Sequence, residues 1–261
     1  MTATYGDAEA GTTAAARVAD VLLLFLGGPE SLGVTSIANH LGLSKAVVHR
    51  ILVSLVSRGL LAMDGKTRRY HLGPAAAAVG ARALRGLDAR EIALPVLTRL
   101  RDETGETTTL SMRVDRARVY VEQVGSPREI RMLVALGRRF PLHAGSSSKA
   151  ILAFLRTDVQ ERILSEPLER LTDQTIVDVA ALRDELARIR RSGVATSLGE
   201  RQAGAGSVAA PLLGLDGYSV GAISVCGPAE RFGGDRSHQY QSLVSEAAQA
   251  ISRKLGWGGP L

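Results

Sequence analysis

The sequence predicts an α+β protein of two domains joined by a linker helix. The chain has 261 residues, more than one domain usually contains. Its first seventy residues combine helical periodicity with one hairpin signal, whereas the remainder alternates between strand and helix patterns. Hydrophobic residues make up 45% and charged residues 22%, which is typical of a globular protein with a substantial core. We place the first domain at residues 12–74, the linker helix at 75–88 and the second domain at 89–258.

Positive charge is concentrated in a short part of the chain. The formal net charge is +6, and residues 31–74 alone carry six basic residues against one acidic residue. A basic patch confined to one small segment favours a polyanionic partner over a merely solvated face. Aromatic residues make up only 4%, which argues against binding of single strands by base stacking.

Three helices are predicted in the first domain. The first has apolar residues at helical spacing and stops at Gly27-Gly28-Pro29. The second begins with Thr35 as its N-cap and ends at Gly42. The third follows Ser44 and ends at Gly59, and it turns an apolar stripe inward: Val48, Ile51, Leu52 and Leu55.

The exposed face of the third helix and a hairpin after it carry the basic residues. The N-terminal end of the helix presents Lys45, Ala46, His49 and Arg50. Residues 60–63 and 68–72 are predicted strands around a tight Asp64-Gly65 turn, and the hairpin carries Lys66, Arg68 and Arg69. This combination predicts a winged helix-turn-helix whose third helix enters the major groove of double-stranded DNA while the wing contacts phosphates or the minor groove. The alternative is a small helical interaction module that binds protein.

The rest of the chain predicts mixed strands and helices. Residues 74–84, rich in alanine and glycine, form the connecting helix, and Asp88 caps the longer helix that follows and ends at Gly105. Alternating side chains predict strands at residues 107–114 and 118–124. Further short strands are expected at residues 131–135, 194–197, 206–212 and 219–226. Helices are expected at residues 147–155, 159–164, 180–191 and 235–255. Such an order favours an antiparallel sheet flanked by helices.

Residues 43–55, 58–61 and 70–73 resemble the DNA-binding signature of the IclR family of bacterial transcriptional regulators. By that resemblance Ser44, Lys45, His49 and Arg50 contact DNA. The sequence departs from the family at Val47, where a small hydroxyl residue is common. Repression is the commoner mode of the family, and its members are often dimers or tetramers.

The resemblance extends into the second domain, at residues 141–153, 199–211 and 222–228. It implies a GAF-like domain that binds small organic acids or aromatic compounds. A helix start with free N–H groups at Ser146 and Ser147 suits an anion. The resemblance adds the other effector-binding positions: Ser197 or Leu198, Ser207, Ser224 and Cys226. Departures occur at Ser148, where glycine is common, and at Ser197 or Leu198, where some members carry an acidic residue. We expect a small carboxylate or aromatic acid.

Other functions receive less support. Ser146 and Lys149 match S-x-x-K of penicillin-recognising serine hydrolases, but the chain lacks S-D-N and K-T-G. The histidines show no metal-ligand spacing, and residues 204–206 are too short for a dinucleotide fingerprint. We therefore expect neither a metal nor a cofactor, and no enzymatic activity. Cys226 is the single cysteine and is expected to be a small buried side chain.

The expected partners are operator DNA, a small-molecule effector and a second copy of the chain, because helix-turn-helix proteins usually bind two half-sites as dimers. The early apolar run at residues 21–26 is too short for a membrane span or a signal h-region. Together with the lone cysteine, this predicts a protein of the cytoplasm without a membrane partner.

Overall fold

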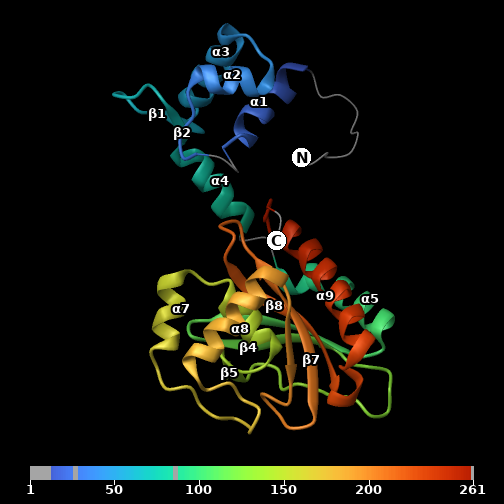
Figure 1. Cartoon of the computed structure of the whole chain (residues 1–261). Helices are drawn as coiled ribbons and strands as arrows, with labels where there is room; N and C mark the ends of the chain where they lie inside the picture. The colour runs from blue at the N-terminus through green and yellow to red at the C-terminus, as the bar shows by residue number, and fades with distance from the viewer. Residues whose placement is uncertain (1–12, 26–28, 85–87, 260–261) are drawn as a thin grey trace. The chain divides into compact units, whose positions relative to one another are not determined.

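The computed structural model describes residues 13–25, 29–84 and 88–259. The chain forms two compact units, residues 1–87 and 88–261, each with its own core (Figure 1). The domain limits drawn from the sequence remain predictions, although the structure groups the connecting helix with the first unit. None of the described helices is long and apolar enough to cross a membrane.

The first unit consists of helices around one small core, with a two-stranded hairpin. Its elements are α1 (Thr13–Leu23), α2 (Val34–Leu41), α3 (Lys45–Ser57), β1 (Leu61–Met63), β2 (Tyr70–Leu72) and α4 (Pro74–Leu84). Val21, Ile37, Val48 and Leu52 are fully buried in that core. The inward stripe predicted for the third helix is therefore its core face. The predicted N-cap Thr35 is wrong, because α2 already begins at Val34 and its N-cap is Gly33.

The hairpin differs from the predicted two-residue turn. Strands β1 and β2 pair antiparallel from Leu61 to Met63, and residues 64–69 form the loop between them. The Asp64 carboxylate accepts hydrogen bonds from the Lys66 and Thr67 backbone N–H groups, at 2.9 and 2.7 Å. Arg68 has a positive φ of 57°, so the returning strand begins only at Tyr70. The loop is longer because the Asp64 side chain organises it as a turn of its own.

The second unit is a six-stranded antiparallel sheet in the order β5-β4-β3-β8-β7-β6, flanked by helices. Its strands are β3 (Thr107–Val114), β4 (Ala117–Val124), β5 (Arg139–Pro141), β6 (Ala195–Leu198), β7 (Ala205–Leu213) and β8 (Ser219–Pro228). Its helices are α5 (Ala89–Thr104), α6 (Ser146–Ala153), α7 (Thr157–Leu164), α8 (Val179–Ser192) and α9 (Gly234–Lys254), with a short 3-10 turn at Ala229–Arg231. The predicted α+β class is confirmed.

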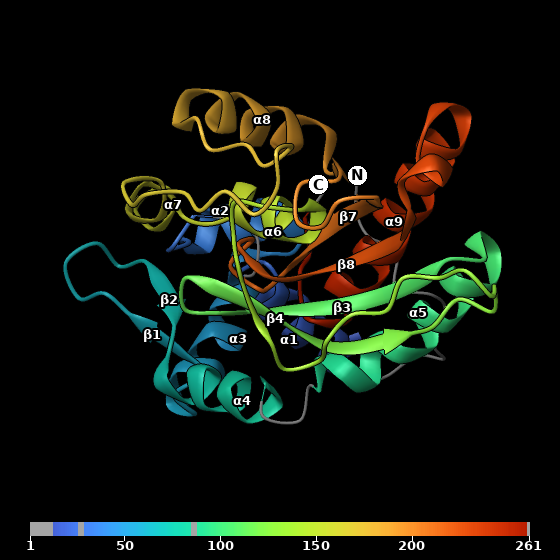
Figure 2. The same cartoon turned by 90° about the horizontal axis from the view of Figure 1, so that it is seen from below.

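Each face of this sheet has its own hydrophobic core. Val208, Ala210, Ile223 and Val225 point to α5 and α9. The alternate positions point to α6, α7 and α8, as Ala209 does, because neighbouring residues of a strand face opposite sides. Figure 2 shows α6, α7 and α8 on one side of the sheet and α5 on the other.

The strand predicted at residues 131–135 is wrong. That segment is irregular, and the strand that pairs with β4 is β5 at Arg139–Pro141. The backbone of Val134 bonds to the side chain of Gln123, donating at 3.0 Å and accepting at 3.1 Å. Leu133 is 56% exposed and its neighbour Val134 is buried. A difference between neighbours is typical of a strand, but residues 131–135 pair with no strand of the six-stranded sheet.

Candidate DNA interface and ligand pocket

The N-terminal end of α3 presents a cluster of polar and basic side chains. Ser44 caps the helix and accepts a hydrogen bond from the Val47 N–H at 3.4 Å. Lys45, Ala46, His49 and Arg50 are all exposed. Among the described residues, neither Lys45 nor Arg50 lies within ion-pair distance of a carboxylate. The predicted residues therefore share one accessible surface that a polyanion can approach.

The three basic residues of the wing differ in their surroundings. Lys66, Arg68 and Arg69 are exposed in the loop between β1 and β2. The Arg69 guanidinium donates to the side chain and the backbone carbonyl of Ser31, so it holds the loop against the segment before α2. Leu32 and Tyr70 form a bridge at the same place. Lys66 and Arg68 are consequently the wing cations best placed to reach phosphates.

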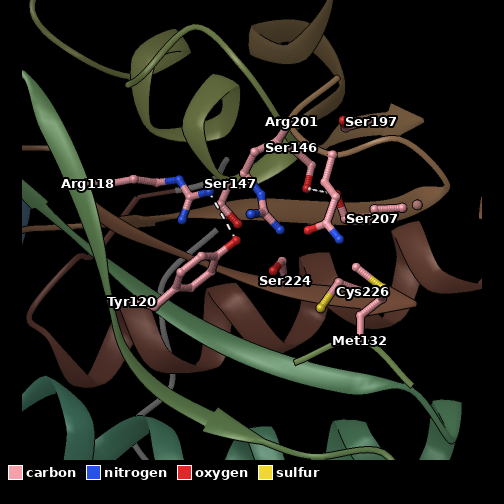
Figure 3. Close-up of a pocket in the computed structure, with 14 residues that line it drawn as sticks. Arg118, Tyr120, Met132, Ser146, Ser147, Ser197, Arg201, Ser207, Ser224 and Cys226 are labelled. Atoms are coloured by element: carbon pink, nitrogen blue, oxygen red, sulfur yellow. Dashed lines mark hydrogen bonds between the residues drawn. The ribbon is translucent and has the colours of Figure 1, made fainter. Parts of the chain in front are cut away.

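In the second unit, a polar pocket lies at the N-terminus of α6, on the α6 side of the sheet (Figure 3). Six of the predicted positions line it: Ser146, Ser147, Ser197, Ser207, Ser224 and Cys226. The three residues on β7 and β8 meet there because Ser207, Ser224 and Cys226 occupy the same face of neighbouring strands. The hollow encloses about 410 Å³ including its open mouth.

Leu198 is the predicted position that does not line this pocket. It is 52% exposed, whereas its neighbour Ser197 is buried and faces the hollow. Adjacent residues of a strand point to opposite faces, so only one of the two alternatives can line the pocket.

The sequence reasoning missed two arginines and a tyrosine in the pocket: Arg118, Tyr120 and Arg201. Arg118 is only 1% exposed and its guanidinium lies 4.3 Å from the centre of the Tyr120 ring. Arg201 lies over the same ring at 5.9 Å. The i, i+2 spacing of Arg118 and Tyr120 on a strand whose alternate positions are apolar was the available signal.

The S-x-x-K arrangement is used structurally. The Ser146 hydroxyl donates to the Ser207 hydroxyl at 2.7 Å, whereas the Lys149 ammonium donates to Glu185 at 2.9 Å and to Glu200. Lys149 is 1% exposed, so its ion pairs compensate a buried charge. The lysine is occupied by two carboxylates, and this disfavours its use as a base for Ser146.

Cys226 is equally unsuited to nucleophilic chemistry. Burial raises the pKa of its thiol to about 12, although Arg201 and Arg118 act in the opposite direction. A thiol with that pKa remains protonated near neutrality. Within the described parts of the chain, no three histidine, cysteine, aspartate or glutamate side chains are grouped so that they could hold a metal ion.

Glu185 provides a pH-dependent prediction. Burial alone would raise the pKa of its carboxyl, but hydrogen bonds from Arg188 and Lys149 outweigh burial and lower the pKa from 4.5 to about 2. A lowered folded-state pKa adds stability that is complete above the unfolded value and is lost as the pH falls. We expect Glu185→Gln to lose on the order of 2 kcal/mol at pH 7. The difference from wild type should disappear between about pH 4.5 and pH 2 in urea unfolding. A difference independent of pH would contradict this assignment.

Comparison with known proteins agrees with the two-unit architecture. The model of the IclR helix-turn-helix domain matches residues 14–65, and that of the C-terminal domain of IclR bacterial transcriptional regulators matches residues 81–253. The regulator BhcR of Paracoccus denitrificans is 37% identical over 93% of this chain and 87% of its own. The repressor IclR of Escherichia coli is 28% identical over 88% of this chain and 84% of its own.

Solved structures give the same result. An IclR-type regulator of Silicibacter sp. TM1040 superposes with a TM-score of 0.82 at 26% identity, over 95% of this chain and 98% of its own. An IclR homologue of Microbacterium hydrocarbonoxydans, solved in complex with 4-hydroxybenzoate, superposes with a TM-score of 0.59 at 28% identity, over 94% and 99%. This chain therefore belongs to the IclR family of bacterial transcriptional regulators and is a ligand-responsive, DNA-binding protein.

Proposed function

We propose that this regulator is a cytoplasmic homo-oligomeric repressor without enzymatic activity, and that a small organic acid bound in the pocket of the second unit changes its affinity for operator DNA. The DNA half of the proposal rests on the two faces of α3. Val48, Leu52 and Leu55 are buried, whereas the opposite face exposes Lys45 and Arg50 at the end that the Ser44 cap fixes. Such a helix is anchored by its core face and free to enter the major groove.

The wing and the charge distribution support the same proposal. Lys66 and Arg68 are exposed in the loop that follows α3 and β1, within the segment that carries most of the net positive charge. Phosphate contacts of this kind supply affinity and register, while side chains of the recognition helix supply sequence discrimination. A two-fold homodimer would present two such helices to a palindromic operator.

The ligand half of the proposal rests on the chemistry of the pocket. Serine hydroxyls from α6, β6, β7 and β8 converge there with two guanidinium groups. These groups bind a carboxylate through charge-assisted hydrogen bonds. The relative that binds 4-hydroxybenzoate also carries a ligand with an acidic function, which agrees with this chemistry.

Fluorescence anisotropy with the upstream intergenic DNA of the gene tests the DNA half. We expect saturable binding that survives unrelated competitor duplex and weakens steeply with salt. Arg50→Ala should reduce specific affinity about 10- to 100-fold, because a base contact contributes about 1–3 kcal/mol. Arg58→Ala is the matched control, since it removes the same charge at the C-terminal end of the same helix. Equal affinity of the Arg50 variant and wild type, or no binding at low salt, would overturn the proposal.

A thermal-shift panel of carboxylic acids tests the ligand half. An acid that raises the unfolding temperature should also change the anisotropy titration with operator DNA. A folded, DNA-binding protein that responds to no acid would contradict the ligand half while leaving the DNA half intact.

A further inference from the structure

Arg118 differs from the other charged side chains that are buried in the described residues. Glu106 pairs with Arg128 and Arg231, Glu122 pairs with Arg90, and both Lys149 and Glu200 belong to one ion pair. Arg118 is as deeply buried as these, yet no described carboxylate lies within ion-pair distance of it. A buried charge without a counter-charge is costly, and proteins normally pair it.

The hydrogen-bond partners of Arg118 are neutral. Its guanidinium donates to Ser148 at 2.7 Å, to Ser111 at 2.9 Å and to the Tyr120 hydroxyl at 3.1 Å. A guanidinium has five N–H donors in a planar fork, so these three bonds orient the group and leave donors for a further acceptor. Burial lowers the pKa of Arg118, and the nearby charge of Arg201 acts in the same direction.

Arg201 brings a second positive charge to the same place. Its guanidinium lies 5.1 Å from the centre of the Phe140 ring, and that of Arg118 lies 5.2 Å from it. Figure 3 shows both side chains extending into the pocket from different elements, above Tyr120. The fourteen residues that line the pocket include these two cations and no acidic residue. Two converging guanidinium groups repel each other unless a ligand supplies negative charge between them.

The buried carboxylates of the described residues are already engaged. Glu200 precedes Arg201, but it accepts hydrogen bonds from Lys149 and from the Gly145 N–H. Glu106 is held by Arg128 and Arg231. The protein therefore neutralises its other buried charges with its own side chains and leaves two positive charges in this pocket.

The free space limits the size of the ligand. Within the hollow, the volume that the centre of a water molecule can reach is about 20 Å³. That is room for one or two water molecules. The lining includes Met132 and Tyr120, and a bulky ring would displace more of it than a short aliphatic chain would.

We propose that the effector of this protein is a short aliphatic dicarboxylate, bound with one carboxylate at Arg118 and the other at Arg201. The inference depends on the proposed function, in which this pocket is the effector site. Two carboxylates match the two guanidinium groups in charge. Because the free space holds only one or two water molecules, any diacid must displace side chains of the lining, and a backbone of about two to four carbons requires the least displacement. Serine hydroxyls and the free N–H groups at the start of α6 supply the remaining donors.

Isothermal titration of the full-length protein with paired acids tests this inference. Oxalate, malonate and succinate are compared with acetate, propionate and butyrate, and with benzoate, 4-hydroxybenzoate and inorganic phosphate. We expect at least one dicarboxylate to bind about 10- to 100-fold more tightly than the monocarboxylate of equal length. The dicarboxylate that binds most tightly should also change the affinity of the protein for operator DNA.

Three variants test which guanidinium group binds which carboxylate. Arg201→Gln should abolish the preference for two carboxylates, so that a dicarboxylate binds no more tightly than the monocarboxylate of equal length. Arg118→Lys, which keeps the charge and loses the planar fork, should weaken both classes. Arg138→Gln is the matched control, because Arg138 also lies over the Phe140 ring, at 5.4 Å, but does not line the pocket. It should bind like wild type.

The possible outcomes separate this inference from the proposed function. Tighter binding of a monocarboxylate or an aromatic acid would overturn the dicarboxylate and leave an acid-responsive regulator. Binding of phosphate alone would also overturn it. No binding of any acid by a protein that still binds its operator would overturn both the dicarboxylate and the ligand half of the proposed function.

Discussion

Replacing Gly73 with alanine is expected to destabilise the DNA-binding unit strongly while the second unit keeps its stability. Gly73 connects β2 to α4, and its N–H donates to the Leu60 carbonyl at 2.9 Å. An added Cβ would lie 2.3 Å from the Gly59 carbonyl oxygen and 3.0 Å from the Leu61 carbonyl carbon. Both are backbone atoms, so the clash can be relieved only by a shift of the main chain and not by rotation of a side chain.

The expected cost of this substitution is about 3 kcal/mol, the upper part of the usual range for overpacking. A small domain has a total stability of about 5–15 kcal/mol, so this loss removes much of it. The wing and α3 pack on one core, and operator binding should therefore fall with the stability of the unit. Two-transition thermal unfolding and DNA anisotropy measure both effects.

Gly65→Ala is the control for this prediction. Gly65 lies in the wing loop, has no atom within 4 Å of an added Cβ and does not have a positive φ. It should change stability by about 0.5 kcal/mol or less, as most surface substitutions do. Equal unfolding temperatures for the two variants would contradict the close approach at Gly73.

Replacing Lys149 with methionine is expected to destabilise the second unit by about 3–5 kcal/mol, because it leaves the Glu200 carboxylate buried without its cation. Methionine fills a similar volume, so the loss reports the charge rather than a cavity. Glu185 retains its bidentate partner Arg188. The effect should therefore come mainly from Glu200, which is 7% exposed.

A double variant isolates this charge effect. Lys149→Met with Glu200→Gln removes both charges while the glutamine amide oxygen can still accept from the Gly145 N–H. Most of the lost stability should return, since replacing both partners of a buried pair by neutral groups is often nearly neutral. If the double variant is as unstable as Lys149→Met, the loss arises from packing instead.

Local patterns in the sequence predicted most of the fold. Helical spacing located α3 and its buried stripe, and strand alternation located β3 and β4, because each of these elements packs one face on a core. The strand expected at residues 131–135 is absent, and there the side chain of Gln123 rather than a neighbouring strand bonds to the backbone of Val134. A long-range side-chain contact of this kind leaves no periodic signal.

The sequence predicted only some of the residues that line the pocket. Ser207 and Ser224 were found through the family resemblance, and Ser146 also through its position at a helix start. The fold brings these serines together. Arg118 and Arg201 were missed because arginine usually marks a solvated surface. Only the tertiary structure reveals that Arg118 is buried beside uncharged partners.

The serine-rich lining of the pocket has an evolutionary consequence. Ser146, Ser197, Ser207 and Ser224 are short side chains on a rigid frame of sheet and helix, and they contribute little to either hydrophobic core. Exchanging a hydroxyl for a methyl or an amide there would change which ligand fits while leaving both hydrophobic cores intact. A few point mutations in this lining can thus change ligand preference while the residues of the DNA-binding unit stay the same.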